Sequence, residues 1–379
     1  MTKRFFIWLL TGLCLTGIFF TQLFAATAAE PASDDLLRAL RIDSPLSLCN
    51  EPVPLTDSQN RERFEKEMLV SLGNRYQVIL WLKRTTRFFP TIERVLSENG
   101  LPGDLKYLAI AESALRVHAG SSKGAMGVWQ LMPQTAQKYG LTVNGRVDER
   151  RSFCLSTPAA ASYLKDLHSR FGSWSLALAA YNMGEEGLAA EILEQAVTDY
   201  YSLYLPLETQ RFVFRILAIK CIVENPQQYG FFLEPDEFYP PRVFATVPFD
   251  ALTELPLRLV AEASGTDFKT VKDLNPHIRG YYLTAGSHRL NIPPDGEAGF
   301  EKRLRDLAAS DDRTRDRRLY RVQEGDSLSG IAKKFDVPLA ALLIWNRIPI
   351  NAVIHPGQRL VVLPFTLGKD WQTETAGGD

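Results

Sequence analysis

Apolar residues recur at helical spacing through much of the first two thirds of the chain. Apolar positions three and four residues apart predict amphipathic helices. The segments with this pattern are RERFEKEMLVSLG, RYQVILWLKRTTRFFPTIERVLSENG, TPAAASYLKDLHSRFG, SWSLALAAYNMG and TQRFVFRILAIKCIVEN. Glycines separate them, and Pro133 and Pro158 suit the first turns of helices. We therefore expect a mainly helical domain over residues 61–240, which the clustered prolines of PDEFYPPRVF bring to an end.

Beyond that domain the pattern becomes strand, helix, helix, strand, and it occurs twice. PLRLVAEASGTDFKTVKDLNP aligns without a gap with DSLSGIAKKFDVPLAALLIWNR. Leu257 then matches Leu328, and Asn275 matches Asn346. Such self-similarity predicts two related α+β (βααβ) modules. The predicted parts are a first module at 243–296, a charged linker at 297–318, a second module at 319–364 and a tail at 365–379. The pattern leaves a helix open for the linker, which we expect to be a solvated spacer and not a binding site.

One carboxylate interrupts the apolar pattern of the helical domain. Leu105, Leu108, Glu112 and Leu115 share one helical face, and three of these four residues are leucines. An acid in an apolar wall has a raised pKa and can donate a proton to the leaving oxygen of a glycosidic bond. Spacing alone leaves open a surface glutamate or a structural ion pair.

The first residues resemble an export signal. MTKR is basic, FFIWLLTGLCLTGIFF is apolar, and Ala26-Thr27-Ala28 fits a cleavage site. We predict a signal peptide at residues 1–28, an irregular segment at 29–60, and a periplasmic or envelope-associated protein. An uncleaved segment would instead tie the protein to the membrane.

Composition excludes several other classes of function. The chain has 43 basic and 44 acidic residues, so no charge excess favours nucleic acid. Cys49, Cys154 and Cys221 follow the signal segment, which allows one disulfide whose pairing stays open. The five histidines are scattered without an H-E-x-x-H motif, so we predict no metal and no cofactor. Ser122 lies in a G-x-S-x-G motif but without the preceding strand that a serine hydrolase needs.

Four motifs over residues 100–215 resemble the lytic transglycosylase domain of soluble and membrane-bound peptidoglycan transglycosylases, in particular the membrane-bound murein transglycosylase D type. The motifs are Glu112-Ser113; Ser121, Gly124-Ala125, Gly127, Gln130, Met132 and Pro133; Ala180-Tyr181-Asn182-Met183-Gly184; and Glu208-Thr209-Gln210-Arg211-Phe212-Val213. The resemblance implies a lysozyme-like helical fold. It also implies non-hydrolytic cleavage between muramic acid and glucosamine with an anhydro-muramyl product.

In that family a single acid performs the reaction, and here it would be Glu112. After donating its proton, Glu112 would act as base on the primary hydroxyl of the sugar, an intramolecular nucleophile with high effective molarity. The family pattern assigns substrate contacts to Ser113, Ser121, Gln130, Met132, Tyr181 and Asn182. Phe212 departs from the usual tyrosine of the last motif, so one hydroxyl is missing.

The second module resembles the LysM carbohydrate-binding module, which binds N-acetylglucosamine chains in a shallow groove. The matching segments are Tyr320-Arg321-Val322, Gly325-Asp326-Ser327-Leu328, Asn346-Arg347-Ile348-Pro349 and Pro356-Gly357-Gln358. The residues that the resemblance implies for glycan binding are Asp326, Ser327, Arg347, Ile348 and Ile350. The first module lacks the Gly-Asp-Ser-Leu loop, so we expect a spacer there.

These patterns together predict an exported peptidoglycan lytic transglycosylase whose glycan-binding module holds it to the cell wall. Three alternatives stay open, of which a peptidase rests only on the weak serine motif at Ser122. A hydrolytic muramidase would use the same acid with water as nucleophile. A non-catalytic wall-binding protein would use the LysM module alone, with the helical domain as scaffold.

Overall fold

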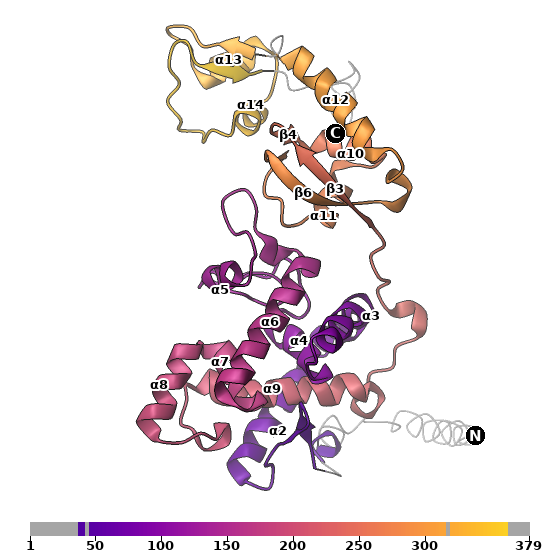
Figure 1. The fold of residues 1–379 in the computed structure, drawn as a ribbon, viewed down its shortest axis with the longest axis vertical. Coiled ribbons are helices and arrows are strands. Elements are labelled where there is room, and N and C mark those ends of the chain that lie inside the picture. Colours follow the sequence, from indigo (N-terminus) through magenta and orange to yellow (C-terminus); the bar gives the residue numbers. More distant parts are fainter. Residues whose placement is uncertain (1–36, 42–44, 316–318, 363–379) are drawn as a thin grey trace, which may run out of the picture. The chain divides into compact units, whose positions relative to one another are not determined.

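The computed structural model describes residues 37–41, 45–315 and 319–362, and for 312–315 the backbone alone. The predicted signal peptide and the tail lie outside these ranges. The chain divides into two compact units. Unit 1 contains residues up to Leu141 and Phe153–Pro241, and unit 2 contains Thr142–Ser152 and the chain from Arg242 onward. Figure 1 shows the helices of unit 1 and the mixed structure of unit 2.

In its described residues, unit 1 is mainly helical and contains one short hairpin. Its elements are β1 (Ser47–Leu48), β2 (Glu51–Pro52), α2 (Ser58–Gly73), α3 (Arg75–Glu98), α4 (Lys106–Ser113), α5 (Pro133–Lys138), α6 (Phe153–Phe171), α7 (Trp174–Met183), α8 (Glu185–Gln195) and α9 (Leu207–Glu224). Short 3-10 turns at Gly103–Leu105, Tyr200–Ser202, Pro226–Tyr229 and Pro235–Glu237 connect them. Asp57 caps α2 and Ser173 caps α7, each accepting a bond from a first-turn amide.

Helix α9 forms the centre of the core of unit 1. It packs on α2, α4 and α7, and most of its side chains are buried (Figure 1). A helix that is apolar on nearly every side belongs inside a domain.

Pro133 opens α5 as predicted, but Pro158 does not open a helix. Helix α6 begins earlier, at Phe153, whose ring makes an edge contact with Phe88 at 4.8 Å between centroids.

Unit 2 contains two βααβ modules in tandem. In the first, β3 (Ala245–Ala251) pairs antiparallel with β6 (Gly286–Ile292), β4 (Leu255–Pro256) pairs with β5 (Tyr282–Leu283), and α10 (Leu257–Ala263) and α11 (Phe268–Leu274) lie between them in sequence. In the second, β7 (Leu319–Arg321) pairs with β8 (Arg359–Val361) around α13 (Leu328–Lys334) and α14 (Leu339–Asn346). The mainly helical part followed by small α+β modules agrees with the predicted fold class.

The two modules share one arrangement of hydrogen bonds at the end of the second helix. The side-chain nitrogen of Asn275 donates to Val271 O and Asn291 O, and its oxygen accepts from Asn291 N at 2.8 Å. Asn346 makes the corresponding three bonds, to Leu342 O, to Val361 O and from Val361 N. Asn275 and Asn346, which the sequence alignment paired, therefore each join the second helix of their module to its last strand.

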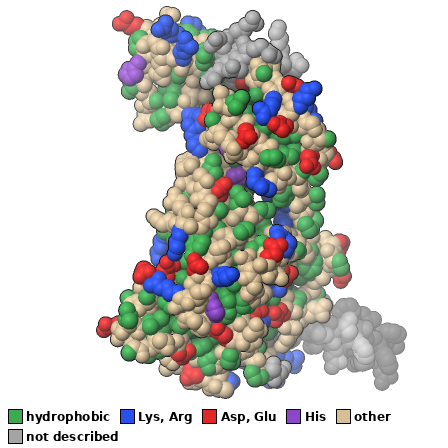
Figure 2. All heavy atoms as spheres, in the orientation of Figure 1, with side chains coloured by type: hydrophobic (Ala, Val, Ile, Leu, Met, Phe, Trp, Pro, Cys, Tyr) green, Lys and Arg blue, Asp and Glu red, His purple; other side chains and the backbone are tan. Residues whose placement is uncertain are grey.

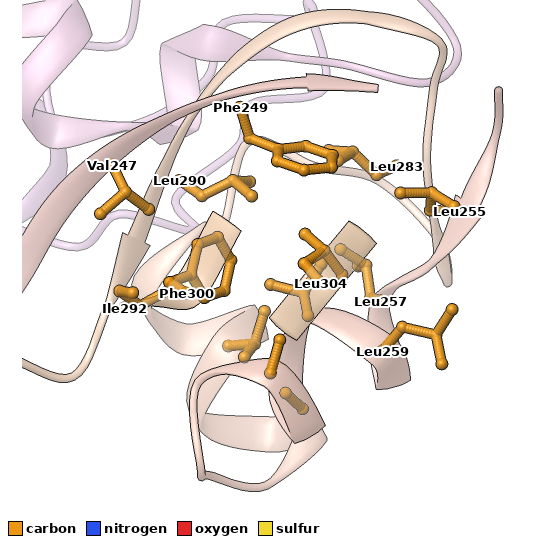
Figure 3. Packing of buried hydrophobic residues seen from close by; sticks show 14 of the residues in the cluster. Val247, Phe249, Leu255, Leu257, Leu259, Leu283, Leu290, Ile292, Phe300 and Leu304 are labelled. Atoms are coloured by element: carbon orange, nitrogen blue, oxygen red, sulfur yellow. The ribbon is translucent and has the colours of Figure 1, made fainter. Parts of the chain in front are cut away.

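The segment expected to be a charged linker contains helix α12 (Phe300–Arg315). Phe300 and Leu304 are buried and complete the core of the first module, where Figure 3 shows them facing Val247 and Leu290 of the two strands. The expectation missed this role because these apolar residues are few among many charged ones. The first module thus has an additional helix that packs against it.

Residues 142–152 belong to unit 2, although the predicted helical domain contained them. Asp148 N donates to His277 O at 2.9 Å, and Arg279 N donates to Arg146 O at 2.8 Å. Within this segment Glu149–Arg151 forms a 3-10 turn, and Arg150 makes a buried ion pair with Asp148 at 2.8 Å. The segment therefore packs against the first module through backbone pairing.

Candidate active site

Glu112 lies in the last turn of α4, where the chain reverses sharply. Ala114 and Leu115 follow with φ of 55° and 61°. Two consecutive non-glycine residues in the left-handed region are uncommon, and strain of this kind concentrates at functional sites. Arg84 Nη1 donates to Ala114 O at 2.9 Å and holds the turn. The helix thus ends where it presents the acid.

The carboxyl group of Glu112 is placed to hold a proton. The residue is half-buried, between the fully buried Leu108 and Leu115, and no hydrogen bond or ion pair joins its side chain to another described residue. Burial raises the pKa of Glu112 to about 8, Arg215 opposes this rise, and Glu208 adds to it. The negative end of the α4 dipole acts in the same direction as burial. At neutral pH the group is therefore an acid with a proton to donate.

A network on α9 and α2 adjoins this acid. Glu67 is buried and accepts from Arg211 Nε at 2.5 Å and from Arg215 Nε at 3.3 Å. Arg215 also lies 4.0 Å from the carboxylate of Glu208. The arginine that influences Glu112 is thus held by a second, buried carboxylate.

Tyr181 lies at the end of α7 and close to the acid. Its hydroxyl donates to Trp129 O at 2.6 Å, and its ring packs on Tyr163 at 5.3 Å between centroids. Burial, then the charges of Glu112 and Tyr163, hold its pKa well above 10. The phenol is therefore neutral, and its hydrogen bond to Trp129 fixes the loop before Met132 to α7.

Asn182 and the last motif are joined directly. The side-chain oxygen of Asn182 accepts from Thr209 Oγ1 at 2.8 Å, which ties α7 to α9. Phe212, the departure from the family tyrosine, is buried with 1% of its surface exposed. Its ring packs in the core of unit 1, so the missing hydroxyl removes a polar group from the interior.

The polar residues between α4 and α5 bond chiefly to the backbone. Ser113 is buried and donates to Ala109 O at 3.1 Å, and Ser121 Oγ accepts from Ala125 N at 3.0 Å. Gln130 donates to Ala119 O and Gly127 O, closing the loop on itself. Met132 has 39% of its surface exposed. These contacts shape the loop, and the predicted sugar contacts of all four residues stay predictions.

The LysM candidates fall into three environments. Asp326 accepts from Tyr320 Oη and Gln323 N, while Ser327 caps α13 through Gly330 N. Ile348 packs against the small core of the module, and Ile350 is exposed. Arg347 ends α14 in the left-handed conformation and bonds to Glu254 of the first module. Their roles in glycan binding stay predictions.

Other candidate chemistry is not assembled in the described residues. Cys49, Cys154 and Cys221 are all free there, so the disulfide that the sequence allowed does not form between them. Within the same ranges no three His, Cys, Asp or Glu side chains gather as metal ligands. None of the described helices combines the length and apolar character of a membrane span. Figure 2 shows acidic and basic side chains interspersed over the face drawn, in line with the near-zero net charge.

Sequence reasoning missed Glu67, Arg215 and Trp129. Arg211 bonds to Glu67 at a sequence separation of 144 residues, so no local spacing indicates the pair. The sequence signal for Glu67 is its helical spacing, which places it on the same side of α2 as the apolar residues Phe64 and Met68.

Comparison with known families matches two segments of the chain. Residues 91–202 match the model of the transglycosylase SLT domain, and residues 320–363 match the LysM domain. The chain therefore carries an SLT transglycosylase domain and a C-terminal LysM domain, which confirms the predicted resemblance.

Among individual proteins, the chain is similar to the membrane-bound lytic murein transglycosylase D of Escherichia coli K12, with 32% identity over 281 residues. The match covers 70% of this chain and 61% of the relative, so the chain spans less than two thirds of that protein. The same protein of E. coli O6:H1 matches equally.

Among solved structures, the 70 kDa soluble lytic transglycosylase of E. coli matches with 19% identity and a TM-score of 0.34. The match covers 49% of this chain and 34% of the soluble transglycosylase. An inactive mutant of the lytic transglycosylase Slt from Pseudomonas aeruginosa matches at 23% identity with a TM-score of 0.30, covering 41% and 26%.

Proposed function

We propose that the protein is a peptidoglycan lytic transglycosylase in which Glu112 is the catalytic acid and base. The observation that carries the proposal is a half-buried carboxyl group without a partner among the described residues, whose pKa is raised to about 8. The SLT domain around it supports the reaction class. The LysM domain supports the cell wall as substrate and an exported, envelope-associated protein.

The reaction follows from one group acting twice. Protonated Glu112 donates its proton to the oxygen between muramic acid and glucosamine, and the bond from the anomeric carbon to that oxygen breaks. The carboxylate then accepts the proton of the primary hydroxyl of the muramic acid as that oxygen bonds to the anomeric carbon. Glu112 regains its proton, no water is consumed, and the product ends in a 1,6-anhydro ring. The half-buried position of Glu112 favours this cycle because both protonation states are accessible near neutral pH.

The neighbouring residues have supporting roles in this proposal. Tyr181 is neutral and fixes Trp129, while Asn182 and Thr209 fix α7 to α9. Three residues between α4 and α5 would contact the glycan: Ser121, Gln130 and Met132. The LysM module would hold the enzyme to its polymer and raise the local concentration of substrate.

The comparisons do not favour a hydrolytic muramidase, but a residue near Glu112 allows this alternative to be tested directly. Glu208 is close enough to Glu112 to raise its pKa, and its own side chain is largely exposed. A second carboxylate near the acid is what activation of water requires. Glu208 therefore enters the test as a separate variant.

The test is digestion of purified sacculi, with the released fragments read by mass spectrometry. We expect anhydro-muramyl ends from the wild type and from Glu208→Gln, and no fragments from Glu112→Gln. Reducing muramic ends that disappear in Glu208→Gln would replace the proposal with the hydrolase. Binding to sacculi without any cleavage by the wild type would leave a wall-binding protein.

A further inference from the structure

A hollow of about 400 Å³ lies in unit 2 where the first module meets the LysM module. Its lining residues are Pro256, Arg258, Phe268, Tyr281, Tyr282, Ala341, Ile344 and Trp345. These side chains come from β4, α10, α11 and β5 of one module and from α14 of the other; Figure 1 draws α14 beside β4. The volume is within the range of small-molecule sites, and an aromatic lining with a few polar groups is typical of them.

The aromatic side chains of the hollow offer flat surfaces to a ligand. The rings of Phe268 and Tyr281 stack at 5.6 Å between centroids with an angle of 25°. Tyr281 is 50% exposed and Trp345 is half-buried, so part of each ring remains open to solvent. The electron-rich face of an aromatic ring attracts the C–H face of a sugar ring. Four aromatic residues gathered at one junction therefore suit a saccharide.

A second hollow of about 400 Å³ shares Tyr281 and Tyr282 with the first and is positively charged. Arg146, Arg279 and Arg347 line it, together with Gly145 and Gly280. Glu254 pairs with two of these arginines, with Arg146 at 2.5 Å and with Arg347 at 2.6 Å. The guanidinium group of Arg347 also lies over the ring of Tyr282 at 3.9 Å.

The third arginine has no such partner. Among the described residues, no ion pair engages the side chain of Arg279, which is exposed at the rim. Three arginines beside one glutamate leave an excess of positive charge. Guanidinium groups bind carboxylates in a bidentate manner, so a carboxylate beside the sugar would complement this charge.

We propose that the junction is a second glycan-binding site that takes a carboxylate-bearing saccharide, with the sugar on Tyr281 and Trp345 and the carboxylate on Arg279. Muramic acid substituted with a short peptide has this chemistry. The inference rests on the proposed function, because it assigns the site to the same polymer. It gives the first module a binding role, whereas its sequence predicted a spacer.

The test uses the full chain with Glu112→Gln, so that no ligand is consumed. The probes are an N-acetylmuramyl dipeptide with a free carboxylate and its methyl ester, each bearing a photoreactive diazirine, with cross-links mapped by mass spectrometry. We expect cross-links in 279–282 and 341–347, about tenfold weaker binding of the ester by calorimetry, and the same loss in Arg279→Ala. Tyr281→Ala should weaken both probes. Arg289→Ala, which changes an exposed arginine of the same module away from the hollow, should weaken neither.

Two results would overturn the inference. Cross-links confined to the surroundings of Glu112 or to residues 323–327 would place all binding elsewhere. Equal affinity for acid and ester, unchanged in Arg279→Ala, would remove the role of the arginine rim. The digestion of sacculi by the active enzyme is independent of these outcomes, so failure of this site and failure of the transglycosylase proposal are distinguishable.

Discussion

The surroundings of Glu67 and of Glu112 show two outcomes for a carboxylate in an apolar environment. Glu67 on α2 has 2% of its surface exposed, and two arginines of α9 meet it. Glu112 on α4 is less buried, no described residue pairs with it, and its pKa rises to about 8. The paired group is a structural anchor, whereas the unpaired one is available for proton transfer. The availability of a partner, more than depth of burial, therefore separates the two roles.

The largest expected difference between the two sites is catalytic. Glu112→Gln keeps the shape of the side chain but cannot donate or accept the proton, so release of soluble fragments from sacculi should fall at least about 10³-fold. Glu98→Gln, which changes an exposed glutamate of α3, is the matched control and should keep full activity. A loss below tenfold in Glu112→Gln would remove this residue from the mechanism.

The second difference is in the free energy of unfolding. Glu67→Ala leaves Arg211 and Arg215 facing an apolar position, which should destabilise the protein by about 3 kcal/mol, as loss of one partner from a buried ion pair does. Urea unfolding followed by circular dichroism measures this change. Unchanged stability would mean that solvent satisfies the arginines and that Glu67 is no anchor.

At Glu112 the expected effect on the free energy of unfolding has the opposite sign, because removal of this carboxyl group should stabilise the protein. The folded protein holds this proton up to a pH of about 8, whereas the unfolded chain loses it near 4.5. Folded protein therefore binds more protons than unfolded chain in this window, and the stability of the wild type falls as pH rises through it. Glu112→Gln does not titrate, so its stability advantage should grow from pH 5 to reach about 1–2 kcal/mol at pH 8, after allowance for solvent screening. Thermal unfolding at pH 5 and pH 8 measures it, and a difference independent of pH would contradict the raised pKa.

The smallest effects concern the groups that influence Glu112. Arg215→Met removes a charge that lowers the pKa of Glu112, so the alkaline limb of the activity profile should move up by about half a pH unit. Glu208→Gln removes a charge that raises this pKa and should move the limb down. A shift of both variants in the same direction would show that neither charge acts on the acid.

The sequence predicted the local features of the molecule better than its distant contacts. The position of Glu112 on an apolar face follows from helical spacing, and the matched Asn275 and Asn346 follow from the repeat. The ion pairs of Glu67 do not, because 144 and 148 positions separate the partners. Helix α12 was hidden by its charged composition, although Phe300 and Leu304 suffice to anchor it.

The loop after α4 illustrates a second limit. Ser121 and Gln130 were expected to face the glycan, and in the structure both bond to the backbone of their own loop. Residue type indicates that a side chain can form a hydrogen bond, but the partner depends on the loop conformation. Here Gln130 itself adopts a positive φ of 47°, which spacing could not predict.

The most direct test of the account is the titration of Glu112 itself. The carboxyl carbon of ¹³C-labelled glutamate can be followed by NMR from pH 3 to pH 10, and its resonance can be assigned by its absence in Glu112→Gln. We expect half-protonation of Glu112 near pH 8, far above the ordinary pKa of glutamate. A midpoint below pH 5 would show that Glu112 is ionised at neutral pH and has no proton to donate.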